Sequence, residues 1–515
     1  MSAPTARPST SPTEPAGGSL RPSRRDVLVG AGAGAAALLL DPLRAGAQPA
    51  AGGTTVFTHT TVVTVDEVRD DVALAVAGDR IVAIGPTDQV LADHPGAAVY
   101  DGRGRAILPG LVNCHAHMGA VVARGFNEDF GFPNTADLAV QPGSLLRGDE
   151  AQLMIRVAAL EAIRTGTTTI VENTGGIAGH AATLAASGLR LVLAESVRDS
   201  ENVAGPMSPE RLAASEAPRF SARLRDEGLQ RIEDLFSAWH GRDGGRISVF
   251  PAAALAETSS PELLQAVRAF AEKHDLGYTI HLTQSRAEAA FMERFHGVRP
   301  AVYLDRHGFL GPRLFAAHCR YVDDAEIAVL GRARTIVTHQ AQMAANRGVI
   351  PPIPALRAAG CPIANGTDNN TNDLFEVMRV ALLTERIRRD DEVPGTRPQP
   401  EDMLEDATLG GATAVNQRAL IGSLEVGKKA DLMVIDTRRA HLVPAGRIVS
   451  AIVHGGHPGD IESVMVDGRF VMRDRRVLTM DEEAIVAEAD RVGRRIWAEV
   501  RAAGPISIPG RPRPR

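Results

Sequence analysis

The sequence is poor in cysteine, in net charge and in long apolar runs. Its three cysteines, Cys114, Cys319 and Cys361, form an odd and sparse set, which argues against a disulfide framework and favours buried free thiols. A formal net charge of −6 over 515 residues, without blocks of like charge, argues against a nucleic-acid partner. No segment beyond the N-terminus has the composition of a membrane span, so we expect no stable membrane anchor. A small-molecule partner is favoured.

The rest of the composition is that of an ordinary globular protein, with 44% apolar and 23% charged residues. A chain of 515 residues exceeds what one hydrophobic core usually supports, so we expect a large catalytic domain with a smaller one attached. The predicted parts are a signal peptide (1–47), a composite β-sandwich (54–106 and 415–480), a barrel (107–414), and a C-terminal helix and tail (481–515).

The N-terminus has the three-part layout of a cleaved export signal. A polar lead is followed by Ser23-Arg24-Arg25-Asp26-Val27-Leu28, an apolar Gly/Ala-rich stretch to Leu40, and Ala45-Gly46-Ala47. The paired arginines resemble a twin-arginine signal, a route that moves folded proteins. A disordered tail that happens to contain Arg-Arg is the alternative. We expect an exported protein.

Short apolar runs alternate with longer helical stretches through the middle of the chain. There are eight such runs: 111–117, 167–173, 189–195, 247–252, 278–283, 314–319, 335–340 and 361–368. Eight βα units in roughly 300 residues fit a (β/α)₈ barrel, and an open doubly wound sheet is the alternative fold. β-branched, alternating segments on both sides of this region predict short strands in the two flanks.

Polar residues at the ends of these runs favour the barrel over the open sheet. They are His115, His117, Glu172, Glu195, His281, His318, His339 and Asp368. The C-terminal ends of barrel strands form the active-site face and can converge on one point, whereas in an open sheet they form a line. A convergent site at the mouth of a barrel is therefore predicted.

Four of these residues form a candidate metal site. His115 and His117 are separated by one residue on a predicted strand, so both side chains point the same way. Together with His281 and Asp368 they supply three imidazoles and one carboxylate, a set suited to Zn²⁺ or Fe²⁺ with a position left for water. A bound cation would lower the pKa of that water towards neutrality, and Asp368 could take its proton.

The other polar residues are candidates for substrate contact. His318 is positioned to hydrogen-bond the water or the attacked atom, and His339 either touches substrate or is structural. Glu172 and Glu195 are further candidates for substrate or proton transfer, with structural hydrogen bonds to neighbouring loops as the alternative. The long loops 118–148 and 197–220 are expected to cover the substrate.

Over residues 54–480 the chain resembles the amidohydrolase superfamily, in the branch of cytosine, guanine and adenosine-type deaminases and triazine hydrolases. The resemblance is carried by Leu108-Pro109-Gly110-Leu111-Val112-Asn113-Cys114-His115-Ala116-His117, Arg164 to Thr169, Ala317-His318-Cys319, Gly366-Thr367-Asp368, Ala407 to Ala412 and Gly422 to Asp431.

This resemblance implies a barrel with a small β-sandwich, a mononuclear metal site at His115, His117, His281 and Asp368, and His318 beside the hydrolytic water. Other branches use two metals bridged by a carbamylated lysine on the fourth strand. The chain has only three lysines, Lys273, Lys428 and Lys429, and none lies there. One divalent ion is therefore expected, zinc first and iron second. Similar enzymes are often homo-oligomers, which is an expectation of the family rather than of this sequence.

The chain departs from the deaminase pattern at one position. Deaminases of this branch have His-x-x-Glu on the fifth strand, whereas this chain has His281-Leu282-Thr283-Gln284. An amide cannot act as acid or base, so Gln284 can orient substrate but not shuttle protons. The leading hypothesis is hydrolysis of a non-peptide C–N bond in a small cyclic nitrogenous substrate. The alternatives are an amide, carbamate or carbon–halogen hydrolase, or a ligand-binding homologue without activity.

Overall fold

The computed structural model describes residues 53–64, 67–128, 138–369, 371–391, 393 and 395–506. The predicted export signal (1–47) and the last part of the predicted C-terminal tail (507–515) lie outside the described residues, as does 129–137 within the predicted substrate-covering loop 118–148. None of the helices in the described ranges combines the length and the apolarity that a membrane crossing requires.

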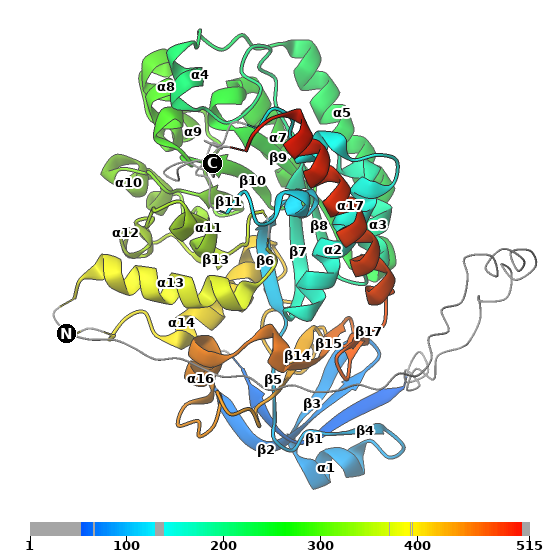
Figure 1. Ribbon diagram of the computed structural model, residues 1–515. Coiled ribbons are helices and arrows are strands. Elements are labelled where there is room, and N and C mark those ends of the chain that lie inside the picture. The colour runs from blue at the N-terminus through cyan, green and yellow to red at the C-terminus, as the bar shows by residue number, and fades with distance from the viewer. Residues whose placement is uncertain are drawn as a thin grey trace, which may run out of the picture. The chain divides into compact units, whose positions relative to one another are not determined.

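Eight parallel strands, each beside the next along the chain, form the centre of the molecule (Figure 1). They are β6 (Leu111–Ala116), β7 (Thr167–Thr174), β8 (Arg190–Val197), β9 (Ile247–Leu255), β10 (Tyr278–Leu282), β11 (Leu314–His318), β12 (Ile336–His339) and β13 (Ile363–Asn365). The ring closes beyond β13, where Ala116 forms a parallel bridge with Asp368. The predicted (β/α)₈ barrel is confirmed, and the open sheet is excluded.

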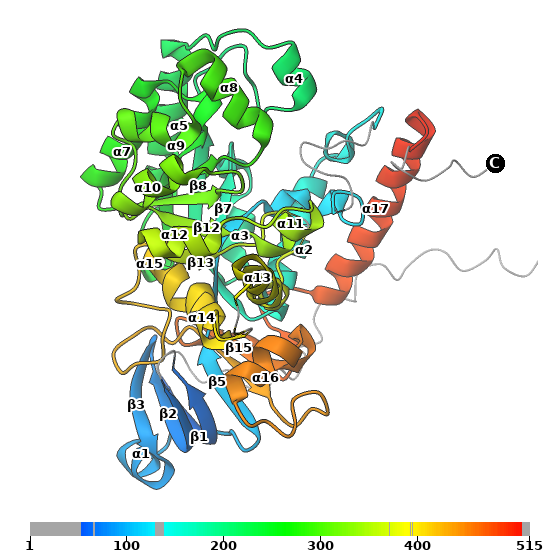
Figure 2. The ribbon, with the colours of Figure 1, turned by 90° about the vertical axis from the view of Figure 1, so that its left-hand side faces the viewer.

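The barrel strands are buried on both faces, which is why their sequences are nearly continuous apolar runs. Helices follow the strands and cover the outside of the ring (Figure 2). They include α2 (Glu150–Arg164), α5 (Ala222–Trp239), α7 (Pro261–Lys273), α8 (Arg286–His296), α10 (Asp324–Arg332) and α13 (Leu374–Arg389). Local sequence sets their starts: the Ser260 and Ser285 side chains accept hydrogen bonds from the amides of Leu263 and Glu288.

The closure of the barrel fixes the segment that carries Asp368. The amides of Thr367 and Asp368 donate to the His115 carbonyl at 3.1 and 2.9 Å. The buried side chain of Asn113 accepts from the Thr367 amide at 3.1 Å and donates to the Thr367 hydroxyl at 2.8 Å. A carboxylate that enters from the eighth strand is thereby held beside the histidines of the first.

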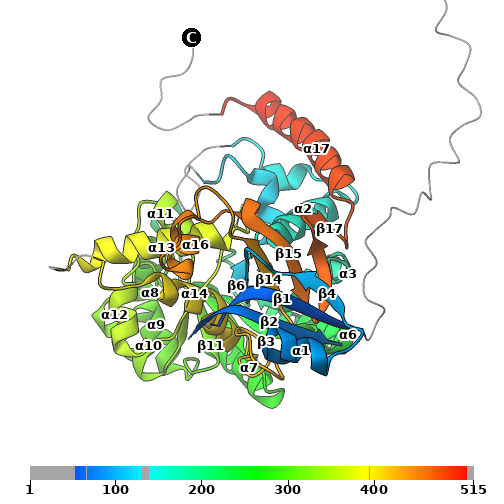
Figure 3. The ribbon, with the colours of Figure 1, turned by 90° about the horizontal axis from the view of Figure 1, so that it is seen from below.

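The two flanks of the chain join in one nine-stranded sheet (Figure 3). The N-terminal flank supplies β1 (Thr54–Val63), β2 (Val68–Ala77), β3 (Arg80–Pro86), β4 (Ala98–Asp101) and β5 (Arg105–Pro109), and the C-terminal flank supplies β14 (Leu432–Asp436), β15 (Ile461–Val466), β16 (Arg469–Arg473) and β17 (Arg476–Val477). They meet where β5 pairs antiparallel with β14. The predicted β structure from both flanks is confirmed, while the predicted domain bounds stay a prediction.

A buried ion pair connects this flank sheet to the N-terminal end of the barrel. Arg190, the first residue of β8, donates from Nε and Nη2 to the two carboxylate oxygens of Asp431 at 2.7 and 3.1 Å, and also pairs with Asp467. The predicted C-terminal helix is present as α17 (Glu482–Ala503), which packs along α2. The Arg190–Asp431 pair holds the end of the barrel that faces away from the candidate site.

Candidate metal centre

The residues predicted as metal ligands come together at the C-terminal mouth of the barrel. His115 lies on β6 and His117 just after it, His281 lies on β10, and Asp368 follows β13. Ligand atoms of His115, His117 and His281 lie within 4.8 Å of one another, and a second such group joins His115, His318 and Asp368. Residues up to 253 positions apart in the sequence thus converge, as a barrel requires; their role as ligands stays a prediction.

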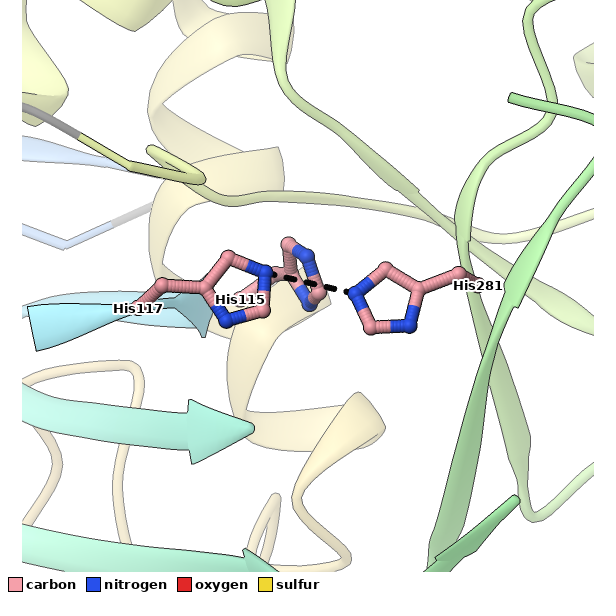
Figure 4. Close-up of side chains that lie close together, drawn as sticks. All are labelled: His115, His117 and His281. Carbon is pink, nitrogen blue, oxygen red and sulfur yellow. Dashed lines mark hydrogen bonds between the residues drawn. The ribbon is translucent and has the colours of Figure 1, made fainter. Parts of the chain in front are cut away.

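The His117 and His281 rings face each other across the mouth (Figure 4), with their Nε2 atoms 3.3 Å apart. His281 Nδ1 donates to the Ala254 carbonyl at 2.9 Å, which leaves a lone pair on Nε2. Two ligands at about 2.0 Å from a tetrahedral metal ion are about 3.3 Å apart. The spacing of these nitrogens therefore fits two ligands of one ion.

His115 supplies the strongest test of whether a metal fits. Its side chain is fully buried, and neither ring nitrogen has a hydrogen-bond partner among the described residues. Buried polar atoms are normally bonded, so an orphaned imidazole needs an explanation such as an ion. The His115 ring centroid lies 4.8 Å from those of both His117 and His281, which places the orphaned nitrogens at the same centre.

Burial keeps the imidazoles of His115, His281 and His318 neutral, as metal binding requires. Burial lowers the pKa of His281 to about 4, with a further contribution from His117. The pKa values of His115 and His318 also lie well below the ordinary histidine value because the rings are buried, and neighbouring imidazoles or Arg320 lower them further. Neutral rings present lone pairs to a cation instead of competing protons.

Asp368 brings the single carboxylate into this group. Its Oδ1 lies 3.6 Å from His117 Nε2, and its Oδ2 lies 4.0 Å from His318 Nδ1 and 3.5 Å from Arg320 Nη2. The carboxylate therefore stands between the imidazoles and a buried guanidinium. From this position the carboxylate could help the histidines to hold a divalent ion and could accept a proton.

Gln284 lies just beyond β10, and its side-chain nitrogen is buried without a hydrogen-bond partner among the described residues. Its backbone amide donates to Glu288 at 2.8 Å, and the amide of Thr283 donates to the same carboxylate at 2.7 Å. The Glu288 carboxylate on α8 thus holds the turn that carries Gln284. The amide side chain retains a donor for a ligand.

The other predicted site residues are Glu172, Glu195 and His339. The two glutamates bond to neighbouring loops, whereas His339 has a ring nitrogen without a partner among the described residues. Glu172 accepts from the Met118 amide at 2.9 Å, and Glu195 accepts from the amides of Gly176 and Ile177, so both hold neighbouring loops. These contacts are those of the structural alternative, and a role in substrate binding stays a prediction. His339 is buried with Nδ1 unbonded among the described residues.

Backbone strain gathers at the same face. His318, Cys319, Thr283 and Asp368 all have positive φ angles, of 81°, 45°, 46° and 69°. Non-glycine residues in this region cost of order 1–3 kcal/mol each and persist where the surroundings enforce them, often at functional sites. Hydrogen bonds from the amides of Cys319 to Leu282 O and of Tyr321 to Thr283 O enforce the turn here.

Sequence reasoning missed Arg320, the most deeply buried cation of the mouth. Its side chain is 3% exposed and points to Asp368. Strand alternation from His318 could not have placed it, because Arg320 lies beyond the end of β11 and follows two residues with positive φ angles. Because arginine is not a common metal ligand, a search for ligand types passed over it.

Comparison with known proteins now gives these residues a family. The model of the "Amidohydrolase family" matches residues 106–471, and that of an "Imidazolonepropionase-like composite domain, bacteria" matches residues 73–97. This chain belongs to the amidohydrolase family. It is a hydrolase of carbon–nitrogen bonds other than peptide bonds, acting on a small nitrogenous substrate.

Relatives of this amidohydrolase include named deaminases. A 5-methylthioadenosine/S-adenosylhomocysteine deaminase of Desulforudis audaxviator is 32% identical over 434 residues, 83% of this chain and 95% of the relative. A 5′-deoxyadenosine deaminase of Methanothermobacter thermautotrophicus is 31% identical over 405 residues, 77% and 89% of the two chains.

Two solved structures with zinc are similar in fold. An adenosine deaminase from Xanthomonas campestris has a TM-score of 0.75 at 26% identity, over 86% of this chain and 98% of that one. An atrazine chlorohydrolase from Arthrobacter aurescens has a TM-score of 0.72 at 21% identity, over 85% and 100%, and supports the fold alone.

Proposed function

We propose that this amidohydrolase removes an amino group from an aminated nitrogen heterocycle by hydrolysis, with one divalent ion held by His115, His117, His281 and Asp368. The observation that carries the proposal is the 3.3 Å approach of His117 Nε2 to His281 Nε2 beside the orphaned His115 ring. Zinc is the first candidate ion and iron the second. The relatives named as deaminases of adenosine-type compounds support an aminated purine-like, pyrimidine-like or triazine-like ring.

The protein's own residues would move the protons. When bound, the ion supplies Lewis acidity that lowers the pKa of a water. Asp368 would take the proton of that water and return it to the departing nitrogen, because its carboxylate lies within 4.0 Å of both His117 and His318. His318, with Nδ1 4.0 Å from Asp368 Oδ2, hydrogen-bonds the water or the attacked ring atom.

Gln284 and His339 would orient the substrate. The unbonded amide nitrogen of Gln284 is a donor for a ring acceptor, and His339 Nδ1 is a second buried atom in want of a partner. Glu172 acts at one remove, through the Met118 amide that it fixes at the base of the loop. At the position where deaminases of this branch have a proton-shuttling glutamate, Gln284 would therefore supply only a hydrogen bond to the substrate.

A screen for the released group tests the proposal. Metal-replete protein is incubated with aminated purines, pyrimidines and triazines, and with amides, carbamates and chlorinated rings, and ammonia, halide and carboxylate are measured. Release of ammonia is the expected result. Halide or carboxylate without ammonia would favour the second candidate function, which the amide at position 284 motivates, and the absence of every product would favour a ligand-binding homologue.

We also propose that residues 1–47 direct export by the twin-arginine route. The proposal rests on the order of Arg24-Arg25, the apolar stretch and Ala45-Gly46-Ala47. The N-terminus of protein recovered outside the cytoplasm should begin near residue 48. An Arg24→Lys/Arg25→Lys variant should stay inside the cell, and unchanged export of that variant would contradict the route.

A further inference from the structure

Arg320 is placed at the metal centre by a strained turn. His318 and Cys319, at the end of β11, have φ angles of 81° and 45°, and the backbone on either side of Arg320 is bonded to the end of β10. Cys319 N donates to Leu282 O at 2.9 Å and Tyr321 N to Thr283 O at 3.2 Å. The fold thus holds the Arg320 side chain against Asp368 instead of leaving it in solvent.

The bonding of this guanidinium is incomplete. Among the described residues its one hydrogen-bond partner is Asp368, through Nη2 at 3.5 Å, the outer limit for such a bond. Asp368 and Glu288 are the acids whose charges raise the pKa of Arg320, but the Glu288 carboxylate already accepts hydrogen bonds from the amides of Thr283 and Gln284. A buried guanidinium needs both counter-charge and hydrogen bonds, because an uncompensated buried charge is costly.

The charges around Arg320 add to the imbalance. Arg347, after β12, lies close enough that burial and the charge of Arg320 lower its pKa to about 10. Asp368 contacts Arg320 and its charge also acts on Arg347, and a divalent ion at the histidines would draw on the same carboxylate. Glu128 acts on Arg347, and His339 is kept neutral by burial and nearby arginines. With a divalent ion at the histidines, the positive charges of the ion, Arg320 and Arg347 would exceed the negative charges of Asp368 and Glu128.

We propose that the substrate carries a carboxylate on the same ring as the amino group that is removed. Arg320 binds this carboxylate through two parallel N–H···O bonds, and Arg347 adds positive charge. Guanidinium is the group whose planar fork matches a carboxylate in this way. The position of Arg320 beside Asp368 sets the carboxylate next to the reacting carbon. The inference rests on the proposed function and narrows its substrate to acidic heterocycles.

The test is a binding comparison with two isosteric probes, pyridine-3-carboxylate and pyridine-3-carboxamide, measured by calorimetry on metal-replete protein. The wild type should prefer the carboxylate. Arg320→Gln should weaken carboxylate binding by about 10- to 100-fold and leave carboxamide binding unchanged. Arg320→Lys, which keeps the charge but not the fork, should retain part of the preference.

A matched control is Arg286→Gln, because Arg286 is exposed on α8, with its guanidinium carbon 4.7 Å from the Tyr321 ring centre. This variant should keep the full preference, which separates a local contact from a general loss of positive charge. The metal content and melting temperature of each variant are measured alongside, so that loss of the ion or of the fold is recognised.

Equal preference in the wild type and in Arg320→Gln would overturn the inference, since the ion alone would then attract the carboxylate. So would binding of neither probe at millimolar concentration. These outcomes are distinguishable from failure of the proposed function. If aminated rings release ammonia and Arg320→Gln changes the rate on carboxylated rings no more than on neutral rings, the deaminase proposal stands and the acidic substrate falls.

Discussion

The two ends of the barrel each bury an arginine against an aspartate, and the two pairs differ in how completely they are bonded. At the N-terminal end Arg190 binds both carboxylate oxygens of Asp431, at 2.7 and 3.1 Å, and a second acid, Asp467. At the C-terminal end Arg320 has a single contact of 3.5 Å with Asp368. Both arginine side chains are almost fully buried, but Arg190 has three hydrogen bonds to carboxylates and Arg320 has one.

The difference in hydrogen bonding distinguishes a structural ion pair, Arg190 with Asp431, from an arginine at the candidate site, Arg320. Arg190, Asp431 and Asp467 join the barrel to the flank sheet, and the two aspartates supply the counter-charge and hydrogen bonds of the buried guanidinium. At the mouth, the His115 ring, the Gln284 amide nitrogen and the Arg320 guanidinium have unmet bonding capacity among the described residues. Active sites of barrel enzymes lie at this face, where such groups await an ion, a water and a substrate.

The largest effect is expected from Asp368→Asn. An amide cannot take the proton of the water, so the rate of ammonia release should fall by about 10³- to 10⁴-fold. The matched control is Asp373→Asn, because Asp373 lies close by in sequence but caps α13 through the amides of Phe375 and Glu376. Steady-state kinetics should find the control close to wild type, and equal losses in both variants would contradict the role of Asp368.

Arg190→Leu tests the ion pair at the N-terminal end of the barrel. It leaves Asp431 and Asp467 without their cation, so the free energy of unfolding should fall by about 3–5 kcal/mol. Urea unfolding measures the change, with Arg156→Leu on the exposed face of α2 as a control that should cost less than about 0.5 kcal/mol. A loss as small as that of the control would show that the pair at this end is dispensable.

A smaller change is expected from Gln284→Glu. This variant tests whether the rate of ammonia release is limited by the absence of a proton-transferring group at position 284. A carboxylic acid at this position could transfer protons to the ring, so ammonia release should rise by about tenfold or more. Gln284→Ala serves as the comparison and should lower the rate because the hydrogen bond is lost. If the glutamate variant releases ammonia no faster than wild type, the amide at position 284 is not what limits deamination.

The smallest effect concerns Glu257, just after β9. Its carboxylate is fully buried, and burial raises its pKa while its charge in turn raises the pKa of Glu288. A raised pKa in the folded state means that the folded protein holds the proton more tightly than the unfolded chain. Its stabilising contribution is complete below the ordinary pKa of about 4.3 and is lost as the pH rises.

Glu257→Gln should therefore be more stable than wild type at about pH 8, by about 1–2 kcal/mol, and the difference should shrink at about pH 5. Urea unfolding at the two pH values checks this. A difference that does not depend on pH would mean that Glu257 does not titrate in this range.

The fold followed from patterns that local physics controls. Each barrel strand is buried on both faces, so its apolar run stood out, and the polar residue at its end marked the functional side of the barrel. The convergence of His115, His117, His281 and Asp368 then followed from topology alone. The alternating texture of the two flanks predicted strands there, and the resemblance to the amidohydrolase superfamily predicted that these segments, more than 300 residues apart, join.

The finer arrangement was not predictable because it depends on which neighbour a side chain meets. Glu172 and Glu195 occupy the expected strand ends, yet their carboxylates bond to loop amides, which no spacing reveals. The approach of Arg320 to Asp368 depends on two consecutive positive φ angles, at His318 and Cys319, and neither is a glycine that would announce them. The tertiary fold imposes that turn.

The most direct test of this account is the metal content of the purified protein, measured by elemental analysis on wild type and on His115→Ala. The account predicts a single divalent ion per chain in the wild type and nearly none in the variant, with the fold retained. Two ions per chain, or an unchanged content in His115→Ala, would contradict it, because the orphaned His115 ring would then have no part in holding the ion.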